Sequence, residues 1–177
     1  KPAIEKARRA GIRTMMITGE YPDTALAIAE EINLVQSDNG RVLTGADLEG
    51  MSDQELLAEI DEVDVFARVS PQHKVRIVEA LKARDQVVAM TGDGVNDAPA
   101  LKRASIGVAM GITGTDVTKE TADMVLTDDN YASIVSAVEQ GRVIYSNIRK
   151  FVYFLISCNM AEIMVIFLGT LFGSGSP

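Results

Sequence analysis

Two short segments of the chain combine threonine, glycine and carboxylate side chains directly after β-rich runs. They are TGE at residues 18–20 and TGDGVND at residues 91–97. Glycine lets a backbone come close to a phosphate, threonine offers a hydroxyl and an N–H, and a carboxylate supplies the hard oxygen that Mg²⁺ prefers. The two segments therefore predict a site for a phosphate group and a magnesium ion.

Three charged side chains extend this prediction. Asp93 and Asp97 lie four residues apart across a glycine-containing turn that starts a helix, where two carboxylates repel unless a cation lies near them. Lys74 falls in the first turn of another predicted helix, directly after a strand. Its ammonium can there reach a phosphoryl oxygen and neutralise charge that develops in a transition state.

Each of these features alone has a plainer explanation. A lone Thr-Gly-Asp is a common turn, and a lone lysine is more often a solvated surface residue. The glycines at 92 and 94 do not form a dinucleotide-binding loop, because Asp97 stands where the third glycine belongs, and the sequence has no Gly-Lys dipeptide of a Walker loop. His73, the single histidine, is predicted as a surface residue at a helix start rather than as a base or ligand.

The elements that must position these residues alternate between short β-rich runs and helical patterns. This alternation is typical of a parallel α/β sheet, in which ligands gather at the carboxyl ends of the strands. Five strands are predicted, at Ile12–Ile17, Val63–Ala67, Gln86–Met90, Ile106–Met110 and Ala122–Leu126.

Helices are predicted between these strands. The clearest has Ser70 as its N-cap, Pro71 at its first position and an end before Arg84. Its predicted inward residues are Val75, Val78, Ala80 and Leu81. Two further helices are predicted at Asp23–Ile32 and Asp53–Ile60, and residues 36–50 are predicted as a turn-rich excursion with signals at Asn39-Gly40, Gly45 and Gly50.

Composition limits the class of protein. With 47% hydrophobic and 24% charged residues among 177, the chain can bury a core, and its length suits about one domain. The formal net charge of −8 argues against nucleic acid as a partner. The single cysteine, Cys158, cannot form an internal disulfide or a cysteine metal cluster. The first residue is Lys1 rather than Met, which we interpret as a piece of something longer.

One segment is predicted to cross a membrane. Residues 151–172 are 22 residues long, and Asn159 and Glu162 are their only strongly polar side chains. At 1.5 Å per residue this length spans the roughly 30 Å hydrocarbon core of a bilayer. Arg149 and Lys150 precede the segment, so the positive-inside rule places residues 1–150 in the cytoplasm. Residues 131–150 are predicted as a stalk helix continuous with the membrane helix, and residues 173–177 as an exoplasmic turn.

Glu162 needs a reason to lie within a bilayer, where an acidic side chain costs about 2.5–3.5 kcal/mol. Asn159 lies three residues earlier on the same helix face, so the two side chains can present oxygens to one cation. The alternative is a hydrogen bond between helices, with Glu162 protonated.

Several segments resemble one family. MTGDGVNDAPALK at residues 90–102 resembles the hinge motif of the P-type cation-transporting ATPases. ITGE at 17–20 is similar to the family's Thr-Gly-Asp motif, and FAR at 66–68 and PQHK at 71–74 are similar to its strand and lysine segment. The resemblance implies a haloacid-dehalogenase-like Rossmannoid parallel sheet, here incomplete, with residues 1–130 forming the later part of a phosphorylation domain.

The resemblance also implies roles for individual residues. Thr18 and Lys74 hold the phosphoryl group, Asn96 hydrogen-bonds it, Asp93 ligates Mg²⁺ and Asp97 supports the metal site from nearby. Thr18, Gly19, Glu20, Thr91 and Gly92 belong to the cofactor-binding site, and Arg68 contacts the nucleotide ribose. Residues 157–162 resemble the fifth membrane helix of sarcoplasmic-reticulum-type calcium pumps, in which Asn and Glu at this spacing ligate calcium. Sodium and potassium pumps usually have Pro before this Glu, whereas this chain has Ala161, so Ca²⁺ is favoured.

Two departures from the family pattern matter. Glu20 replaces the usual Asp, which keeps the charge but adds a methylene. The nucleophilic Asp of the Asp-Lys-Thr-Gly-Thr motif is absent, and TGTD at residues 113–116 has similar letters in another order. The chain is therefore not expected to be active alone.

We expect the chain to be part of a multi-pass membrane pump that uses ATP and Mg²⁺ and forms an aspartyl phosphate. Its expected partners are the nucleotide-binding and actuator domains, the other membrane helices, the lipid bilayer and the transported cation; the membrane is the plasma membrane if the source is bacterial. The alternatives are a Na⁺/K⁺-type or other cation pump, a soluble haloacid-dehalogenase-like phosphatase with an unrelated membrane anchor, and a non-catalytic regulatory module.

Overall fold

The protein is described by a computed structural model that covers residues 1–35 and 40–173. Its chain divides into two compact units, Lys1–Val135 and Ser136–Pro177. The predicted turn at Asn39 lies outside the described residues, as do residues 174–177 of the predicted exoplasmic turn.

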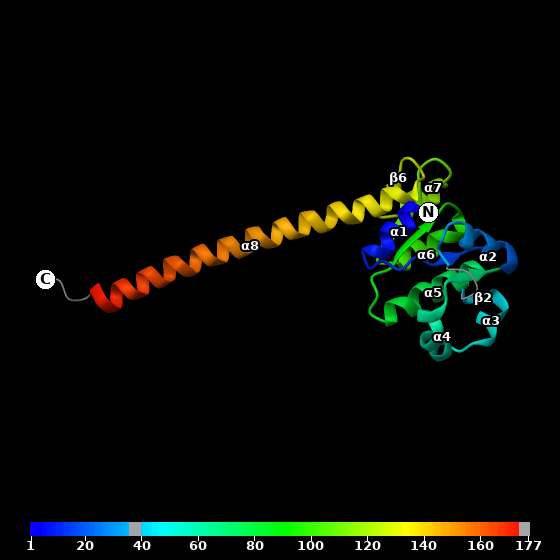
Figure 1. Ribbon diagram of the computed structural model, residues 1–177, viewed down its shortest axis with the longest axis horizontal. Helices are drawn as coiled ribbons and strands as arrows, with labels where there is room; N and C mark the ends of the chain where they lie inside the picture. The colour runs from blue at the N-terminus through cyan, green and yellow to red at the C-terminus, as the bar shows by residue number, and fades with distance from the viewer. Residues whose placement is uncertain (36–39, 174–177) are drawn as a thin grey trace. The chain divides into compact units, whose positions relative to one another are not determined.

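The first unit contains two parallel sheets among its described residues (Figure 1). In one sheet, β3 (Val65–Ala67) lies between β1 (Met16–Ile17) and β2 (Val42–Thr44). In the other, β5 (Ile106–Met110) lies between β4 (Ala89–Gly92) and β6 (Met124–Leu126). All four strand pairings are parallel, which confirms the predicted α/β class. Together with β2, which was not predicted, the five predicted strands form two sheets of three strands each.

Helices lie between the strands along the chain. They are α1 (Pro2–Arg9), α2 (Pro22–Glu31), α3 (Gly45–Gly50), α4 (Asp53–Glu59), α5 (Pro71–Ala83), α6 (Ala98–Arg103) and α7 (Asp116–Thr121), with the 3₁₀ turns η1 (Ile60–Glu62) and η2 (Val95–Asp97). The long α8 (Tyr131–Gly173) follows them.

The prediction of a turn-rich excursion at residues 36–50 is wrong for its second half. Residues 42–44 form β2 and residues 45–50 form α3. Thr44 and Asp47 make a reciprocal capping box, and the hydrogen bond from the Thr44 hydroxyl holds the pKa of Asp47 below its usual value. Gly45, one of the glycines that indicated turns, instead allows close packing, because a Cβ there would overlap the main-chain oxygen of Arg68.

The predicted strands are mostly longer than the observed ones. The first, predicted from Ile12, begins only at Met16, because Met16 is the first residue whose N–H reaches the neighbouring strand, at the Asp64 carbonyl (2.9 Å). Before it, the Arg13 guanidinium binds main-chain carbonyls at Ile60 and Val63, so this stretch is held by a side chain rather than by strand pairing.

Helix α5 packs against both sheets. It begins as predicted, with the Ser70 side chain accepting a hydrogen bond from the His73 N–H. Ile77, which the sequence analysis did not place inward, is fully buried against Phe66 of the first sheet. Val78 is buried in a second cluster with Met90 of the second sheet. Each such burial stabilises the fold by about 1.5–3 kcal/mol, so α5 holds the two sheets in one unit.

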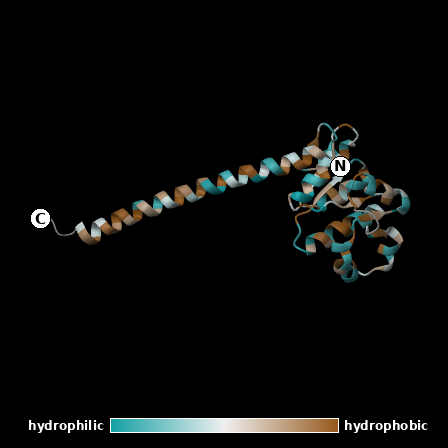
Figure 2. Ribbon diagram, viewed as in Figure 1, coloured by the Kyte–Doolittle hydropathy of each residue, from teal (hydrophilic) through white to brown (hydrophobic). Residues whose placement is uncertain are grey.

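Helix α8 runs for 43 residues without a break, which corresponds to about 65 Å. Among the described residues it is the single helix long and apolar enough to cross a membrane. Figure 2 shows hydrophobic residues dominating toward its C-terminal end. Its side chains from Val143 to Phe172 are exposed, as expected for a helix whose apolar surface is covered by lipid or by other helices.

Candidate functional site

The loop after β4 is built around Asp97. This residue is 6% exposed, and its Oδ2 accepts a hydrogen bond from the Gly94 N–H (3.2 Å). A Cβ at Gly92 would overlap the Cβ of Asp97, so glycine is required there for the loop to close. The glycines of this segment therefore serve the packing of a buried carboxylate as well as the approach of a ligand.

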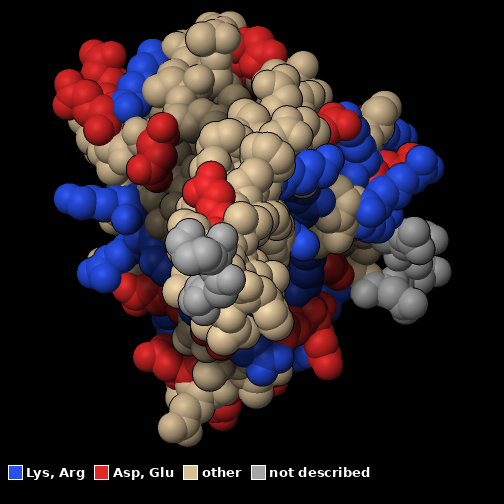
Figure 3. All heavy atoms as spheres, turned by 90° about the vertical axis from the view of Figure 1, so that its left-hand side faces the viewer, with Lys and Arg blue, Asp and Glu red and all other residues tan. Residues whose placement is uncertain are grey.

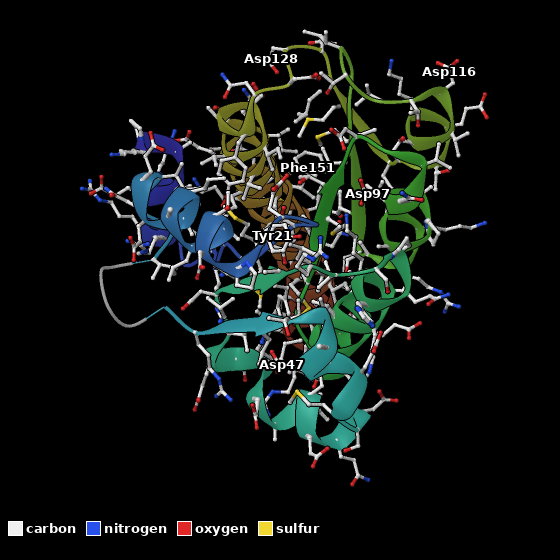
Figure 4. All side chains as sticks on the ribbon, turned by 90° about the vertical axis from the view of Figure 1, so that its right-hand side faces the viewer. Tyr21, Asp47, Asp97, Asp116, Asp128 and Phe151 are labelled. Carbon is white, nitrogen blue, oxygen red and sulfur yellow. The ribbon has the colours of Figure 1, made fainter. Side chains whose placement is uncertain are left out.

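Lys74 compensates the negative charge of this buried carboxylate. Its Nζ lies 2.5 Å from Oδ1 of Asp97, and its side chain is 16% exposed (Figure 4 labels Asp97). The Ser70 cap and Pro71 start α5 directly after the first sheet, which directs Lys74 toward the loop after β4. A buried charge needs a partner, so removing either residue would leave the other uncompensated.

The TGE loop is held at the carboxyl end of the first sheet by main-chain hydrogen bonds. The Thr18 N–H donates to the Phe66 carbonyl (2.9 Å), and the Thr18 carbonyl accepts from the Val69 N–H (3.3 Å). The Thr18 hydroxyl accepts from the Glu20 N–H (3.1 Å), which closes the loop. Because Val69 immediately precedes the cap of α5, the structure brings Thr18 and Lys74 to the same carboxyl end of the first sheet.

Arg68 has a strained backbone beside this loop. Its φ is +55°, in the left-handed region that a residue with a side chain rarely adopts. Its N–H donates to the Glu20 carbonyl (3.0 Å), and its guanidinium carbon lies 4.3 Å from the centroid of the Tyr21 ring. Such strain is concentrated at functional sites. The sequence analysis missed Tyr21, whose exposed ring supports Arg68 by a cation–π contact.

Asp93 presents an exposed carboxylate at the end of β4. Within the described part of the chain, no donor hydrogen-bonds this carboxylate, whereas its main-chain oxygen accepts from the Thr115 N–H (2.9 Å) and the Thr118 hydroxyl (3.2 Å). An accessible carboxylate without a hydrogen-bond donor is the ligand type that Mg²⁺ takes, usually with several waters retained. The residues present therefore fit a magnesium ion at Asp93.

The chain supplies only part of such a metal site. Among the described residues there is no group of three or more His, Cys, Asp or Glu side chains that could hold a metal ion. Both oxygens of Asp97 are already engaged, one by Lys74 and one by the Gly94 N–H. Asn96, the residue before Asp97, is exposed. Gly19 lies in the loop after β1, and Thr91 lies within β4.

His73 differs from its prediction. Its side chain is 12% exposed rather than on the surface, and its Nδ1 accepts a hydrogen bond from the Ser70 N–H (3.2 Å). The imidazole thus completes the cap of α5 and packs against Gly45. The sequence signal for this role was its position three residues after the capping serine.

A second feature missed from the sequence is a carboxylate clamp before α8. Asp129 accepts hydrogen bonds from the N–H groups of Gly111 (2.6 Å), Ile112 (3.0 Å) and Thr113 (2.8 Å). The bond from Ile112, with help from Thr113 and Gly111, holds the pKa of Asp129 below its usual 3.8. Because folding lowers this pKa, the clamp stabilises the folded state fully above pH 3.8. This stabilisation is lost as the pH falls through the pKa of the folded state.

We expect the Asp129→Ala variant to open the loop at residues 111–113. Removing the acceptor frees the amides of Ile112 and Thr113, whose hydrogen exchange the carboxylate now slows, whereas the Gly111 N–H also donates to the Leu126 carbonyl (2.8 Å). Exchange at residues 112 and 113 should therefore rise by at least about tenfold at pH 7. Hydrogen-exchange mass spectrometry of the full-length protein measures this effect. The control is Asp116→Asn, which changes an exposed carboxyl at the start of α7; equal exchange in both variants would contradict the clamp.

Asn159 and Glu162 lie one turn apart on α8. The helix is regular through both residues, and both side chains are exposed on it. Their oxygens are therefore available to a cation from the same face of the helix.

Charge does not gather into one large patch on the face drawn in Figure 3, where acidic and basic side chains intermingle.

Comparison with protein families gives two matches. Two family models, each described as haloacid dehalogenase-like hydrolase, match residues 1–105 and residues 73–138. The matched residues include both glycine-bearing loops and Lys74.

Comparison with individual proteins gives matches along the whole chain. The chain is 57% identical over 177 residues to calcium-transporting ATPase 1 of Bacillus cereus, and 50% identical over 177 residues to the calcium-transporting ATPase of Bacillus subtilis. It covers 20% of the length of each of these two relatives. Among solved structures, a zinc-transporting PIB-type ATPase in its E2.Pi state matches with a TM-score of 0.68 and 31% identity, over 97% of this chain and 23% of that one.

Proposed function

The chain belongs to the haloacid dehalogenase-like hydrolase family, and we propose that it is the segment of an ATP-driven calcium pump that joins the phosphorylation domain to a membrane helix. The observation that carries the proposal is the buried Lys74–Asp97 pair beside the exposed Asp93 carboxylate, on a chain that continues into an apolar 43-residue helix. The 57% identity to a calcium-transporting ATPase along the whole chain supports it.

In this proposal the described residues divide the phosphate site between them. The Lys74 ammonium and the Thr18 hydroxyl bind phosphoryl oxygens, and Asn96 donates a hydrogen bond to the same group. Asp97 holds the Lys74 ammonium in place and closes the loop through Gly94. Asp93 would hold Mg²⁺, which supplies positive charge that stabilises the transferring phosphoryl group.

The phosphoryl acceptor comes from a strand outside this chain. Strands β1 and β4 each have a strand neighbour on one side only among the described residues. Met16 and Thr18 direct their N–H groups toward β3, so by alternation the amide of Ile17 faces the opposite side. Ile17 packs against the cluster that contains Met90 of β4, so an additional parallel strand fits between these two edges.

That strand would carry the nucleophilic aspartate. Its carboxylate oxygen attacks the γ-phosphorus of ATP, the bond from this phosphorus to the bridging oxygen breaks, and ADP leaves. The acyl phosphate forms within reach of Thr18, Lys74 and Asn96. The nucleotide-binding and actuator domains are the proposed partners, and Arg68, held by Tyr21, together with Glu20 forms the edge that faces the nucleotide ribose.

The proposed division of the chain follows the helix. Residues 1–130 belong to the phosphorylation domain, 131–150 to the stalk and 151–172 to the membrane span. Residues 1–150 lie in the cytoplasm, and the pump lies in a multi-pass membrane assembly, in the plasma membrane if bacterial. Asn159 and Glu162 bind the transported cation through oxygen atoms. Oxygen ligands favour Ca²⁺, whereas Zn²⁺ favours nitrogen and sulfur ligands.

The experiment that tests the function measures ATP hydrolysis by the purified full-length protein with Ca²⁺, Na⁺, K⁺, Mn²⁺ or Zn²⁺ added singly. We expect Ca²⁺ to stimulate hydrolysis at least about tenfold over a chelator control at micromolar concentration, within the range of protein calcium sites. Stimulation by another ion alone would replace the cation in the proposal. Hydrolysis without stimulation by any ion would favour the phosphatase alternative.

A further inference from the structure

The backbone of Asp93 is held by a helix that the proposed reaction does not use. Two groups of the loop and first turn of α7 donate to the Asp93 carbonyl: the Thr115 N–H at 2.9 Å and the Thr118 hydroxyl at 3.2 Å. Thr118 is fully buried, and it is one of two buried polar residues among the described ones, the other being Asp97. A fully buried hydroxyl aimed at this carbonyl fixes the position of the residue that carries it.

The hydroxyls of Thr115 and Thr118 form a directed chain. They are hydrogen-bonded to each other, and Thr115 Oγ1 also accepts from the Thr118 N–H. Because the Thr118 hydroxyl has one proton and gives it to the Asp93 carbonyl, the Thr115 hydroxyl is the donor between the two. The whole chain therefore points at Asp93.

The hydroxyl of Thr118 acts outside its own helix, unlike that of Thr121. The Thr121 hydroxyl donates to the Val117 carbonyl (2.7 Å) one turn back in α7, which is the local bond that threonine commonly makes in a helix. Thr118 instead reaches a residue 25 positions away in sequence. Thr121 is thus a matched control: the same residue type on the same helix, with a purely local bond.

The Asp93 carboxylate has no other restraint in the described chain. Its side chain is exposed and without a donor, so its direction depends on where the main chain places the Cα. Strand pairing holds the chain only as far as Gly92, which pairs with Ala109. The bonds to the Asp93 carbonyl are the next restraints along the chain.

We propose that Thr118 is a positioning residue that sets the Asp93 carboxylate in the geometry needed for Mg²⁺. The inference rests on the proposed function and adds to it a residue that does not itself bind the metal ion. A metal ligand displaced by even 1 Å loses much of its effect, because Mg²⁺ demands near-ideal octahedral geometry. Loss of the hydroxyl therefore weakens Mg²⁺ binding without removing any metal ligand.

The test compares Thr118→Ser with Thr118→Ala in the full-length protein, since these variants differ only by the hydroxyl. The measurement is the Mg²⁺ concentration that gives half-maximal phosphoenzyme from radiolabelled ATP, in the presence of Ca²⁺. We expect Thr118→Ser to match the unmodified protein and Thr118→Ala to need about three- to tenfold more Mg²⁺. Thr118→Val, which keeps the volume, should behave as Thr118→Ala, and Thr121→Val should leave the Mg²⁺ dependence unchanged.

The outcomes separate this inference from the proposed function. If the unmodified protein forms no Mg²⁺-dependent phosphoenzyme, the proposed function fails. If it does, and Thr118→Ala and Thr118→Ser need the same Mg²⁺ concentration, the positioning role is overturned. Should Thr118→Val fail to fold, the Ser and Ala pair still decides. A fall in the phosphoenzyme level of Thr118→Ala at unchanged Mg²⁺ dependence shows a structural role only and also overturns the inference.

Discussion

We expect the Asp93→Asn variant of the full-length protein to form less than about one hundredth of the phosphoenzyme that the unmodified protein forms from ATP. The exposed carboxylate at the end of β4 is the described oxygen ligand best placed for Mg²⁺. Asparagine keeps the size and the main-chain bonds to Thr115 and Thr118 but removes the negative charge that holds a divalent ion. The phosphoryl group then meets its acceptor without the cation that offsets the developing charge.

The measurement is acid-stable incorporation of phosphate from radiolabelled ATP at saturating Ca²⁺, over a range of Mg²⁺. The control is Asp116→Asn, which makes the same chemical change at an exposed residue of α7 and should leave phosphoenzyme unchanged. A normal phosphoenzyme level in Asp93→Asn would remove the metal role from this residue. Normal ATP protection against proteolysis in the same variant would show that nucleotide binding survives the change.

The residues of the candidate site could be found from sequence because their types and spacing are chemically restrictive. Asp93 and Asp97 lie four residues apart in a glycine-bearing loop. Together with Lys74 they indicate a phosphate and magnesium site more strongly than any of them does alone. The cap at Ser70 and Pro71 placed α5 correctly, since these signals act within one turn. The apolar run after Phe151 needed only length and composition.

Other features depend on contacts between distant parts of the chain and escaped prediction for that reason. Thr118 and Asp93 are 25 residues apart, and the Asp129 clamp spans 16 to 18 residues. Nothing in the local sequence of either pair shows the partner. The three-residue strand β2 and the six-residue α3 were missed because glycine and asparagine near them indicate turns more strongly than a short apolar run indicates a strand.

The separation into two sheets has a further physical origin. Each strand was predicted from its own apolar pattern, but pairing depends on which strands lie side by side. Strands β1 and β4 have matching free edges in the described chain, and α5 fills the space between their cores through Ile77 and Val78. A pattern of alternating strands and helices indicates the class of fold without indicating which strands pair.

We expect the Glu162→Gln variant of the full-length protein to need at least about tenfold more Ca²⁺ for half-maximal ATP hydrolysis. The affinity of an oxygen site for Ca²⁺ depends on the number of charged ligands, and Glu162 is the only acidic residue of the predicted span. The change preserves shape and hydrogen-bonding capacity, so it removes charge and little else. Phosphorylation from inorganic phosphate in the absence of Ca²⁺ should remain normal, because Lys74, Asp93 and Asp97 are untouched.

This variant distinguishes the two explanations of an acidic residue within the span. If Glu162 were protonated and donated a hydrogen bond to a neighbouring helix, glutamine would donate in its place and the Ca²⁺ dependence would stay unchanged. The control is Thr170→Val, which removes another polar group of α8 whose hydroxyl bonds only to the Ile166 carbonyl of its own helix (2.8 Å). A shift in Glu162→Gln that is absent in Thr170→Val therefore reports a lost cation ligand, since a general disturbance of the helix would move both.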